Sequence, residues 1–362
     1  MKKLGFGMMR LPMVGEEVDI AQTKEMVDRF MAAGFTYFDT AHGYISEKSE
    51  PTVRECLVER YPREAYVLTD KLTGGYIEKE EDIRPFFEKQ LEICGVDYFD
   101  NYLLHAVNAK NCVKYESCNA FGVLKDLKAE GKIKRMGMSF HDKAEVLDRI
   151  LTEHPEIEVV QIQFNYVDYD DPNVESFKCY QVCEKHGKPV LIMEPVKGGN
   201  LVDLPEEGKK VLDELKGGSY ASYAIRFAAS FPQVERVLSG MSNLQQIDDN
   251  ISFMQEFVPL SEREHEAVAR VREILKNQGG IACTACEYCV DGCPKRIPIP
   301  KLFSAYNTQS RYQNWNGKKR YANQTANRGK ASDCIGCGKC ERVCPQNLAI
   351  RDELKKVAEL FE

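Results

Sequence analysis

The sequence predicts an α/β fold in which a (β/α)8 TIM barrel precedes a small, mainly helical domain. Two observations carry this prediction. Short apolar segments alternate with amphipathic ones over the first 258 residues, and eight of the 14 cysteines lie between Cys283 and Cys344. A 362-residue chain that is 43% hydrophobic has room for one large core and one smaller core. We therefore expect a barrel over 1–258, a connecting helix over 259–280 and a cysteine-rich domain over 281–362.

Eight short segments rich in β-branched and aromatic residues are predicted as the barrel strands. They are residues 4–9, 35–40, 65–70, 98–105, 134–140, 159–164, 189–194 and 236–240. Helical patterns such as TKEMVDRFMAAG and DIRPFFEKQLEICG separate them. Regular strand–helix alternation with apolar strands indicates a closed parallel barrel. An open doubly wound sheet is the alternative, and it is disfavoured because no Gly-x-Gly-x-x-Gly motif opens a helix after any strand.

The segment that follows the barrel is predicted as a helix joining the two domains. Ser261 can cap its N-terminus, and Glu264 stands three residues later as in a capping box. Gly279 and Gly280 can end the helix.

The cysteines of the last domain repeat one spacing twice, Cys-x2-Cys-x2-Cys-x3-Cys-Pro. This spacing is typical of proteins with two [4Fe-4S] clusters, in which three cysteines bind one cluster and the fourth binds the other. One predicted ligand set is Cys283, Cys286, Cys289 and Cys344, and the other is Cys334, Cys337, Cys340 and Cys293. Zinc is the weaker alternative, because tetrahedral zinc sites use two paired couples of ligands. We expect a ferredoxin-type domain.

Charge and hydropathy exclude several classes of partner. The formal net charge is −7, and binding to nucleic acid or to an anionic membrane would need a basic face. Apolar runs are too short to span a bilayer, and the N-terminus lacks the pattern of a secretory signal. We expect a cytoplasmic protein. The basic run Lys318, Lys319 and Arg320 is interpreted as solvated surface, with a dock for an acidic protein as the alternative.

Four polar residues follow or close successive predicted strands in the first half of the barrel. They are Asp39, Tyr44, Lys71 and His105. The carboxyl ends of barrel strands hold the chemistry of this fold, so these side chains are expected to be neighbours. A phenol titrates near ~10 unaided, and an adjacent ammonium favours its deprotonated form. This set predicts acid–base chemistry at a carbonyl group, with the histidine orienting the carbonyl oxygen.

The segments FDTAHGY, TDK and YLLH resemble the Asp-Tyr-Lys-His tetrad of the aldo-keto reductase superfamily, and the whole chain resembles its iron–sulfur-containing bacterial branch. The resemblance extends to GFGMMRLP, MGMSFH, VVQIQFNYVD and LSGMSNLQQIDDN. It implies that Tyr44 is the general acid–base, tuned by Lys71 and Asp39, and that His105 positions the substrate carbonyl. It also implies NAD(P)H as the cofactor. The implied cofactor contacts are Met8, Ser139, Gln161, Ser242, Asn243 and Asn250.

The sequence leaves more than one cofactor and more than one function open. The segment 238–250 has no basic residue to bind the 2′-phosphate of NADPH, so NADH, NADPH and a flavin all stay open. One hypothesis is a carbonyl oxidoreductase whose clusters exchange electrons with ferredoxin or another carrier. A second is an ordinary NAD(P)H-dependent carbonyl reductase with structural or oxygen-sensing clusters. A third is a dinucleotide-binding sensor or docking protein, which the complete tetrad disfavours.

Overall fold

The computed structural model describes residues 2–172, 174–277, 280–312 and 316–362. The chain divides into two compact units. The first consists of Met1–Pro195 and Ala221–Ser261, and the second of Val196–Tyr220 and Glu262–Glu362. Both cysteine groups therefore lie in the second unit, together with the segment that follows the seventh barrel strand.

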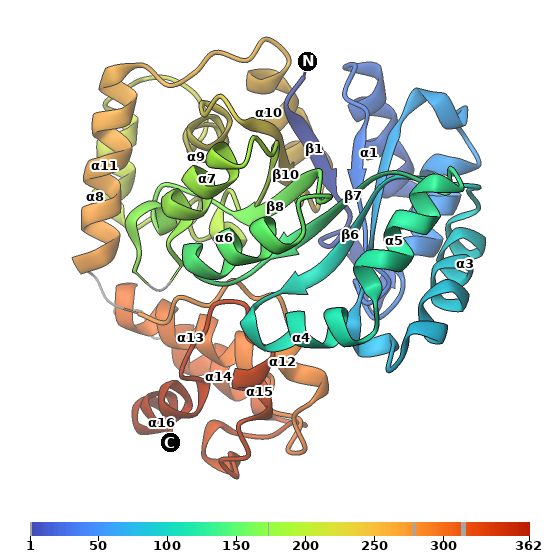
Figure 1. The fold of residues 1–362 in the computed structure, drawn as a ribbon. Coiled ribbons are helices and arrows are strands. Elements are labelled where there is room, and N and C mark those ends of the chain that lie inside the picture. Colours follow the sequence, from blue (N-terminus) through green and yellow to red (C-terminus); the bar gives the residue numbers. More distant parts are fainter. Residues whose placement is uncertain (1, 173, 278–279, 313–315) are drawn as a thin grey trace. The chain divides into compact units, whose positions relative to one another are not determined.

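Eight parallel strands close a barrel in the first unit, which confirms the predicted (β/α)8 fold (Figure 1). The strands are β1 (Leu4–Gly7), β4 (Tyr37–Asp39), β5 (Val67–Leu72), β6 (Phe99–Val107), β7 (Ile133–Phe140), β8 (Val159–Gln163), β9 (Val190–Met193) and β10 (Val234–Ser239). Each strand pairs with the next along this series, and β1 pairs with both β4 and β10 to close the ring. All eight overlap the predicted segments.

Helices surround the strands on the outside of the barrel (Figure 1). They are α1 (Ile20–Ala32), α3 (Ile83–Cys94), α5 (Ala120–Ala129), α6 (Ala144–Glu153), α7 (Ser176–Lys185), α9 (Tyr220–Ala229) and α10 (Leu244–Met254). Shorter helices α2 (Ser49–Val53) and α4 (Ala109–Ser117) lie in loops. Each long helix buries one apolar stripe, as α1 does with Met26, Val27 and Phe30.

The barrel interior is filled by side chains rather than open. One buried layer consists of Tyr37, Leu103, Val159, Leu191 and Leu238. Gly137 on β7 leaves room for this layer, because a Cβ atom there would lie 2.4 Å from the Val159 carbonyl oxygen. A two-stranded hairpin of β2 (Met13–Val14) and β3 (Glu17–Val18) was not predicted, since strands of two residues carry no alternation to detect.

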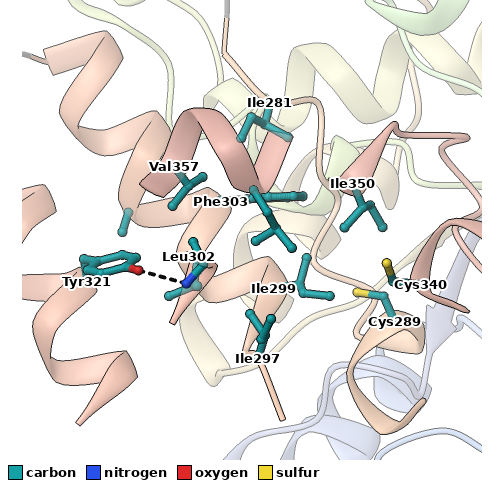
Figure 2. Packing of buried hydrophobic residues seen from close by; sticks show 13 residues of the cluster. Ile281, Cys289, Ile297, Ile299, Leu302, Phe303, Tyr321, Cys340, Ile350 and Val357 are labelled. Carbon is teal, nitrogen blue, oxygen red and sulfur yellow. Dashed lines mark hydrogen bonds between the residues drawn. The ribbon is translucent and has the colours of Figure 1, made fainter. Parts of the chain in front are cut away.

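The second unit is mainly helical. Its helices are α8 (Glu206–Asp213), α11 (Glu262–Asn277), α12 (Tyr288–Asp291), α13 (Ile299–Tyr312), α14 (Asn316–Thr325), α15 (Lys339–Arg342) and α16 (Ile350–Phe361). The helix α11 begins directly after Ser261, and Gly279 lies outside the described residues. Ile297, Phe303 and Ile350 belong to one buried cluster with Cys289 and Cys340 (Figure 2).

In the ranges that the structure describes, no helix combines the length and the apolar character that crossing a bilayer requires.

Candidate active site

The structure brings the four predicted residues Asp39, Tyr44, Lys71 and His105 together. The strands β4, β5 and β6 are consecutive neighbours in the barrel. Asp39 is the last residue of β4, Lys71 lies near the end of β5, and His105 lies near the end of β6. Tyr44 follows on the loop after β4. The barrel therefore places these side chains side by side at the carboxyl ends of its strands.

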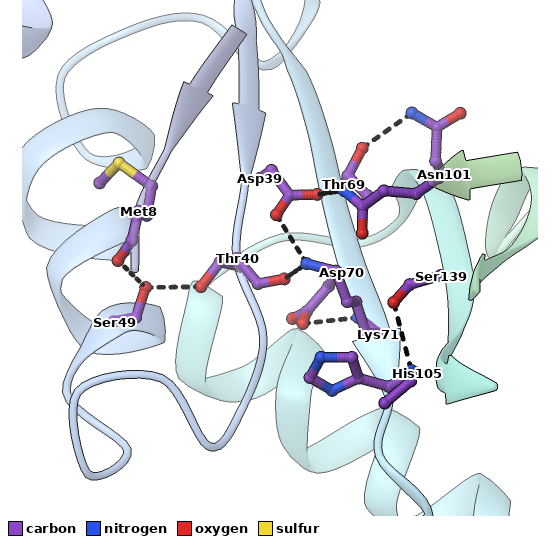
Figure 3. Close-up of polar contacts among 12 residues, drawn as sticks. Met8, Asp39, Thr40, Ser49, Thr69, Asp70, Lys71, Asn101, His105 and Ser139 are labelled. Atoms are coloured by element: carbon purple, nitrogen blue, oxygen red, sulfur yellow. Dashed lines mark hydrogen bonds and ion pairs between the residues drawn. The ribbon is translucent and has the colours of Figure 1, made fainter. Parts of the chain in front are cut away.

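Asp39 and Lys71 form a buried ion pair. The Lys71 Nζ atom donates to Asp39 Oδ1 at 2.6 Å and to the Thr40 carbonyl oxygen at 2.7 Å (Figure 3). Burial raises the pKa of Asp39, and the charge of Lys71 opposes this shift. The pair places a fixed positive charge inside a site from which water is largely excluded.

Tyr44 lies against this charge. The Lys71 Nζ atom is 4.7 Å from the centre of the Tyr44 ring, within the range of a cation–π interaction. The loop that carries Tyr44 is anchored by His42, whose Nδ1 lies 2.6 Å from Glu50 Oε2 on α2. Both side chains of this anchor are buried, which fixes the loop beside the ion pair.

His105 completes the group from the other side. Its ring meets the Tyr44 ring edge to face, with 5.7 Å between the ring centres. Burial holds the pKa of His105 well below its usual range, and the charge of Lys71 adds to the effect. The imidazole is therefore neutral at physiological pH and acts as a hydrogen-bonding group rather than as a cation.

Three residues near this site were missed in the sequence analysis or given another role. The Thr73 hydroxyl lies 2.8 Å from His105 Nδ1. The Gln161 amide donates to Asp39 Oδ2 at 3.1 Å, so this residue contacts the tetrad directly. Burial lowers the pKa of His141 to about 4, with a further contribution from Lys71. The position of His141, one residue after a predicted strand, was the signal that could have identified it.

Four of the six implied cofactor contacts lie in two places in the first unit. Ser139 and Gln161 are register partners on β7 and β8, and the Ser139 hydroxyl accepts from the Ala106 amide at 3.2 Å. Ser242 and Asn243 precede α10, and the Asn243 side chain caps this helix by accepting from the Gln246 amide at 2.9 Å. A capped helix N-terminus directs amide groups at anions such as phosphate.

The remaining two predicted contacts are buried. Met8 is fully enclosed, and its carbonyl oxygen accepts from the Ser49 hydroxyl at 2.9 Å (Figure 3). The Asn250 amide donates to the Ser239 hydroxyl at 2.6 Å.

The eight cysteines of the second unit line two small cavities. Cys283, Cys286, Cys289 and Cys344 line the first cavity, and Cys293, Cys334, Cys337 and Cys340 line the second. Each cavity thus combines three cysteines of one sequence group with the fourth of the other group. Four sulfur ligands around one small space fit a [4Fe-4S] cluster.

Comparison with known families identifies this barrel protein with a cysteine-rich second unit as an oxidoreductase. The chain belongs to the aldo/keto reductase family, whose model matches residues 3–273. A model described as a 4Fe-4S dicluster domain matches residues 282–349. The second unit therefore carries an iron–sulfur domain of ferredoxin type.

Individual relatives agree with this family. The chain is similar to L-galactose dehydrogenase of Arabidopsis thaliana, with 24% identity over 75% of this chain and 90% of the plant protein. It is 25% identical to the NADH-specific methylglyoxal reductase of Escherichia coli over 52% of this chain and 59% of that protein. The fold is similar to a crystal structure of an aldo/keto reductase from Klebsiella pneumoniae in complex with NADP and acetate. That match has a TM-score of 0.62 and 19% identity, and it covers 75% of this chain and 91% of the other.

Proposed function

We propose that this oxidoreductase reduces a carbonyl or a related small molecule at the Asp39, Tyr44, Lys71 and His105 site, coupled to electron transfer through two [4Fe-4S] clusters. The observation that carries the proposal is the buried Lys71 ammonium, which is bonded to Asp39 and lies 4.7 Å from the Tyr44 ring centre. A positive charge held there stabilises a phenolate without help from water.

In this proposal the Tyr44 hydroxyl gives its proton to the substrate oxygen. Lys71 stabilises the phenolate that remains, and Asp39 keeps the ammonium in place. Thr73 donates its hydroxyl hydrogen to His105 Nδ1, so the single proton of the neutral imidazole resides on Nε2. That N–H then donates to the substrate oxygen and orients the carbonyl group.

NAD(P)H is the proposed cofactor, with a flavin as the alternative. Ser139 and Gln161 would hold the nicotinamide amide, and Ser242 and Asn243 at the start of α10 would hold the phosphate and adenosine side. When bound, this cofactor supplies a hydride to the carbonyl carbon. One similar protein is NADH-specific by its name and another was solved with NADP, so NADH and NADPH are both candidate coenzymes.

The two cysteine quartets would each hold one cluster, which supplies one-electron transfer when bound. We propose ferredoxin or another external carrier as the electron partner. A specific observation favours a second function, in which the clusters are structural or oxygen-sensing. Cys289 and Cys340 belong to the buried core of the second unit, and Ile299 lines both cavities, so the clusters would also hold this unit together.

Anaerobically purified protein tests the proposal. We expect about eight iron atoms per chain, since each cluster contains four, and saturable binding of NADH, NADPH or a flavin. Zinc in place of iron contradicts the cluster assignment.

The variant Cys340→Ala separates the two functions. Loss of carrier-linked activity with retained NAD(P)H-linked reduction supports electron transfer. Equal carrier-linked activity in the variant and the wild type contradicts electron transfer and favours the structural role.

A further inference from the structure

We propose that electrons enter and leave at the quartet Cys293, Cys334, Cys337 and Cys340, and that the surface around it docks a small acidic one-electron carrier protein. This inference rests on the proposed presence of clusters in the second unit. The docking face is defined here by six residues: Lys295, Ile335, Cys337, Lys339, Arg342 and Arg351. It differs from the basic run at residues 318–320.

Exposure distinguishes the two quartets. Among the eight described cluster cysteines, Cys337 alone is exposed, whereas the other seven are buried or half-buried. Its neighbour Ile335 lines the same cavity and is 60% exposed. Electron transfer slows steeply with distance, so a carrier should approach the quartet that has a cysteine at the surface. The exposed Ile335 in the same cavity provides the apolar contact that a transient partner can cover.

Positive charge gathers around the same quartet. Lys295 and Lys339 line its cavity, whereas the described residues around the first cavity include no charged side chain. Arg342 and Arg351 reach the same loop, because an atom of each guanidinium lies 3.9 Å from the Cβ position at Gly338. All four basic side chains are exposed.

Most of this charge is available to a partner. Arg351 is bonded to Glu341 at 2.8 Å. Within the described ranges, neither lysine of the docking face nor Arg342 forms an ion pair. Unpaired surface cations raise the association rate of an acidic protein and restrict its orientation.

The charge distribution of the whole chain supports the same partner. Residues 281–362 contain 14 Lys and Arg against 8 Asp and Glu, although the full chain has 49 against 56. The eight ligand thiolates add negative charge on cluster binding, but they do so inside the cavities. An acidic carrier is thus attracted to the cysteine domain and repelled by the remaining chain.

A groove adjoins the docking face. Cys334 and Leu354 line both this groove and the second cavity. Its lining combines apolar Leu354 and Ala358 with two basic and two acidic side chains, Arg351, Lys355, Asp352 and Glu359. A groove of mixed polarity beside the docking face offers a partner apolar contact, and such contact suits the small, transient interfaces of electron carriers.

The test measures binding of oxidised anaerobic holoprotein to an acidic ferredoxin and, in parallel, to an acidic flavodoxin by calorimetry. The double variant Lys295→Glu/Lys339→Glu reverses two charges of the docking face. The matched control Lys318→Glu/Lys319→Glu makes the same charge change on α14, whose two lysines are exposed and line neither cavity. Iron content and visible absorbance of both variants must equal the wild type, which shows that the clusters are intact.

We expect the docking-face variant to raise the Kd about tenfold at low salt, and the control variant to change it less than twofold. Added salt should weaken the wild-type complex more than that of the docking-face variant. An equal rise in Kd for both variants overturns the assignment of this face. The assignment also fails if the wild type binds neither the ferredoxin nor the flavodoxin. Neither result affects carbonyl reduction at Tyr44, so the failure of this inference is distinguishable from the failure of the proposed function.

Discussion

The Lys71 Nζ atom lies 2.6 Å from Asp39 Oδ1, and neither side chain is more than 5% exposed. Placing an ion pair inside a protein costs desolvation energy that close contact only partly returns. The barrel nevertheless holds this ion pair at the carboxyl ends of β4 and β5, where Tyr44 and His105 also lie. The proposed chemistry explains the arrangement, because the ammonium stabilises the tyrosine after it gives up its proton.

Removing the charge of Asp39 should impair both stability and turnover. In Asp39→Asn the Lys71 ammonium keeps the Thr40 carbonyl but loses its counter-ion. We expect unfolding free energy to fall by about 3 kcal/mol and kcat/KM to fall about 100-fold. Urea denaturation and steady-state kinetics measure the two effects. The control Asp28→Asn removes an ion pair with Arg60 on the surface and should cost under about 1 kcal/mol. Equal stability losses in the two variants would refute a special role for the buried pair.

Thr73 should act as a positioning residue through His105. The variant Thr73→Val removes the hydroxyl that lies 2.8 Å from Nδ1 and frees the imidazole to change tautomer. We expect kcat to fall about tenfold with little change in KM, and Thr73→Ser to restore most of the rate. Nitrogen chemical shifts of the histidine ring report the tautomer. An unchanged tautomer in Thr73→Val would contradict this role.

Acid should destabilise the protein through His141, whose side chain is half-buried. Burial lowers the pKa of His141 from 6.5 in the unfolded chain to about 4. Between these values the unfolded chain binds a proton that the folded protein does not, so stability falls as the pH drops from 6.5 toward 4. This residue alone should remove about 2 kcal/mol by pH 5. Denaturation at several pH values should give a shallower acid slope for His141→Gln than for the wild type. Identical slopes would disprove the assignment.

The glycine at position 137 should be required for barrel closure. Its Cβ atom would approach the Val159 carbonyl oxygen to 2.4 Å and the Leu103 side chain to 2.7 Å. We expect Gly137→Ala to lower the free energy of unfolding by about 3 kcal/mol. The control Gly75→Ala meets no atom within 4 Å and should leave stability nearly unchanged. Chemical denaturation compares the two variants, and a neutral Gly137→Ala would show that β7 and β8 can separate at no cost.

The strands of the barrel were predictable because each is a short apolar segment between polar turns. Boundaries were less accurate, since neighbouring strands decide where pairing ends. The first strand was expected to reach residue 9 but ends at Gly7, and β6 continues two residues past His105 to Val107. The two cysteine groups were visible because their spacing is local and repeated.

Contacts between distant segments were not predictable from one sequence. The hydrogen bond from Gln161 to Asp39 joins residues 122 positions apart. The bond between Thr73 and His105 depends on the register of β5 against β6, which side-chain patterns do not specify. The sequence therefore predicts which residues gather at the strand ends, and the structure adds which atoms meet.

Turnover of Tyr44→Phe under anaerobic conditions tests the central proposal most directly. The variant keeps the ring against Lys71 and removes only the hydroxyl group. With clusters and coenzyme affinity intact, kcat/KM for every accepted carbonyl should fall about 1000-fold. The control Tyr61→Phe, which loses a hydrogen bond to Asp28, should match the wild type. Wild-type turnover in Tyr44→Phe would contradict the account.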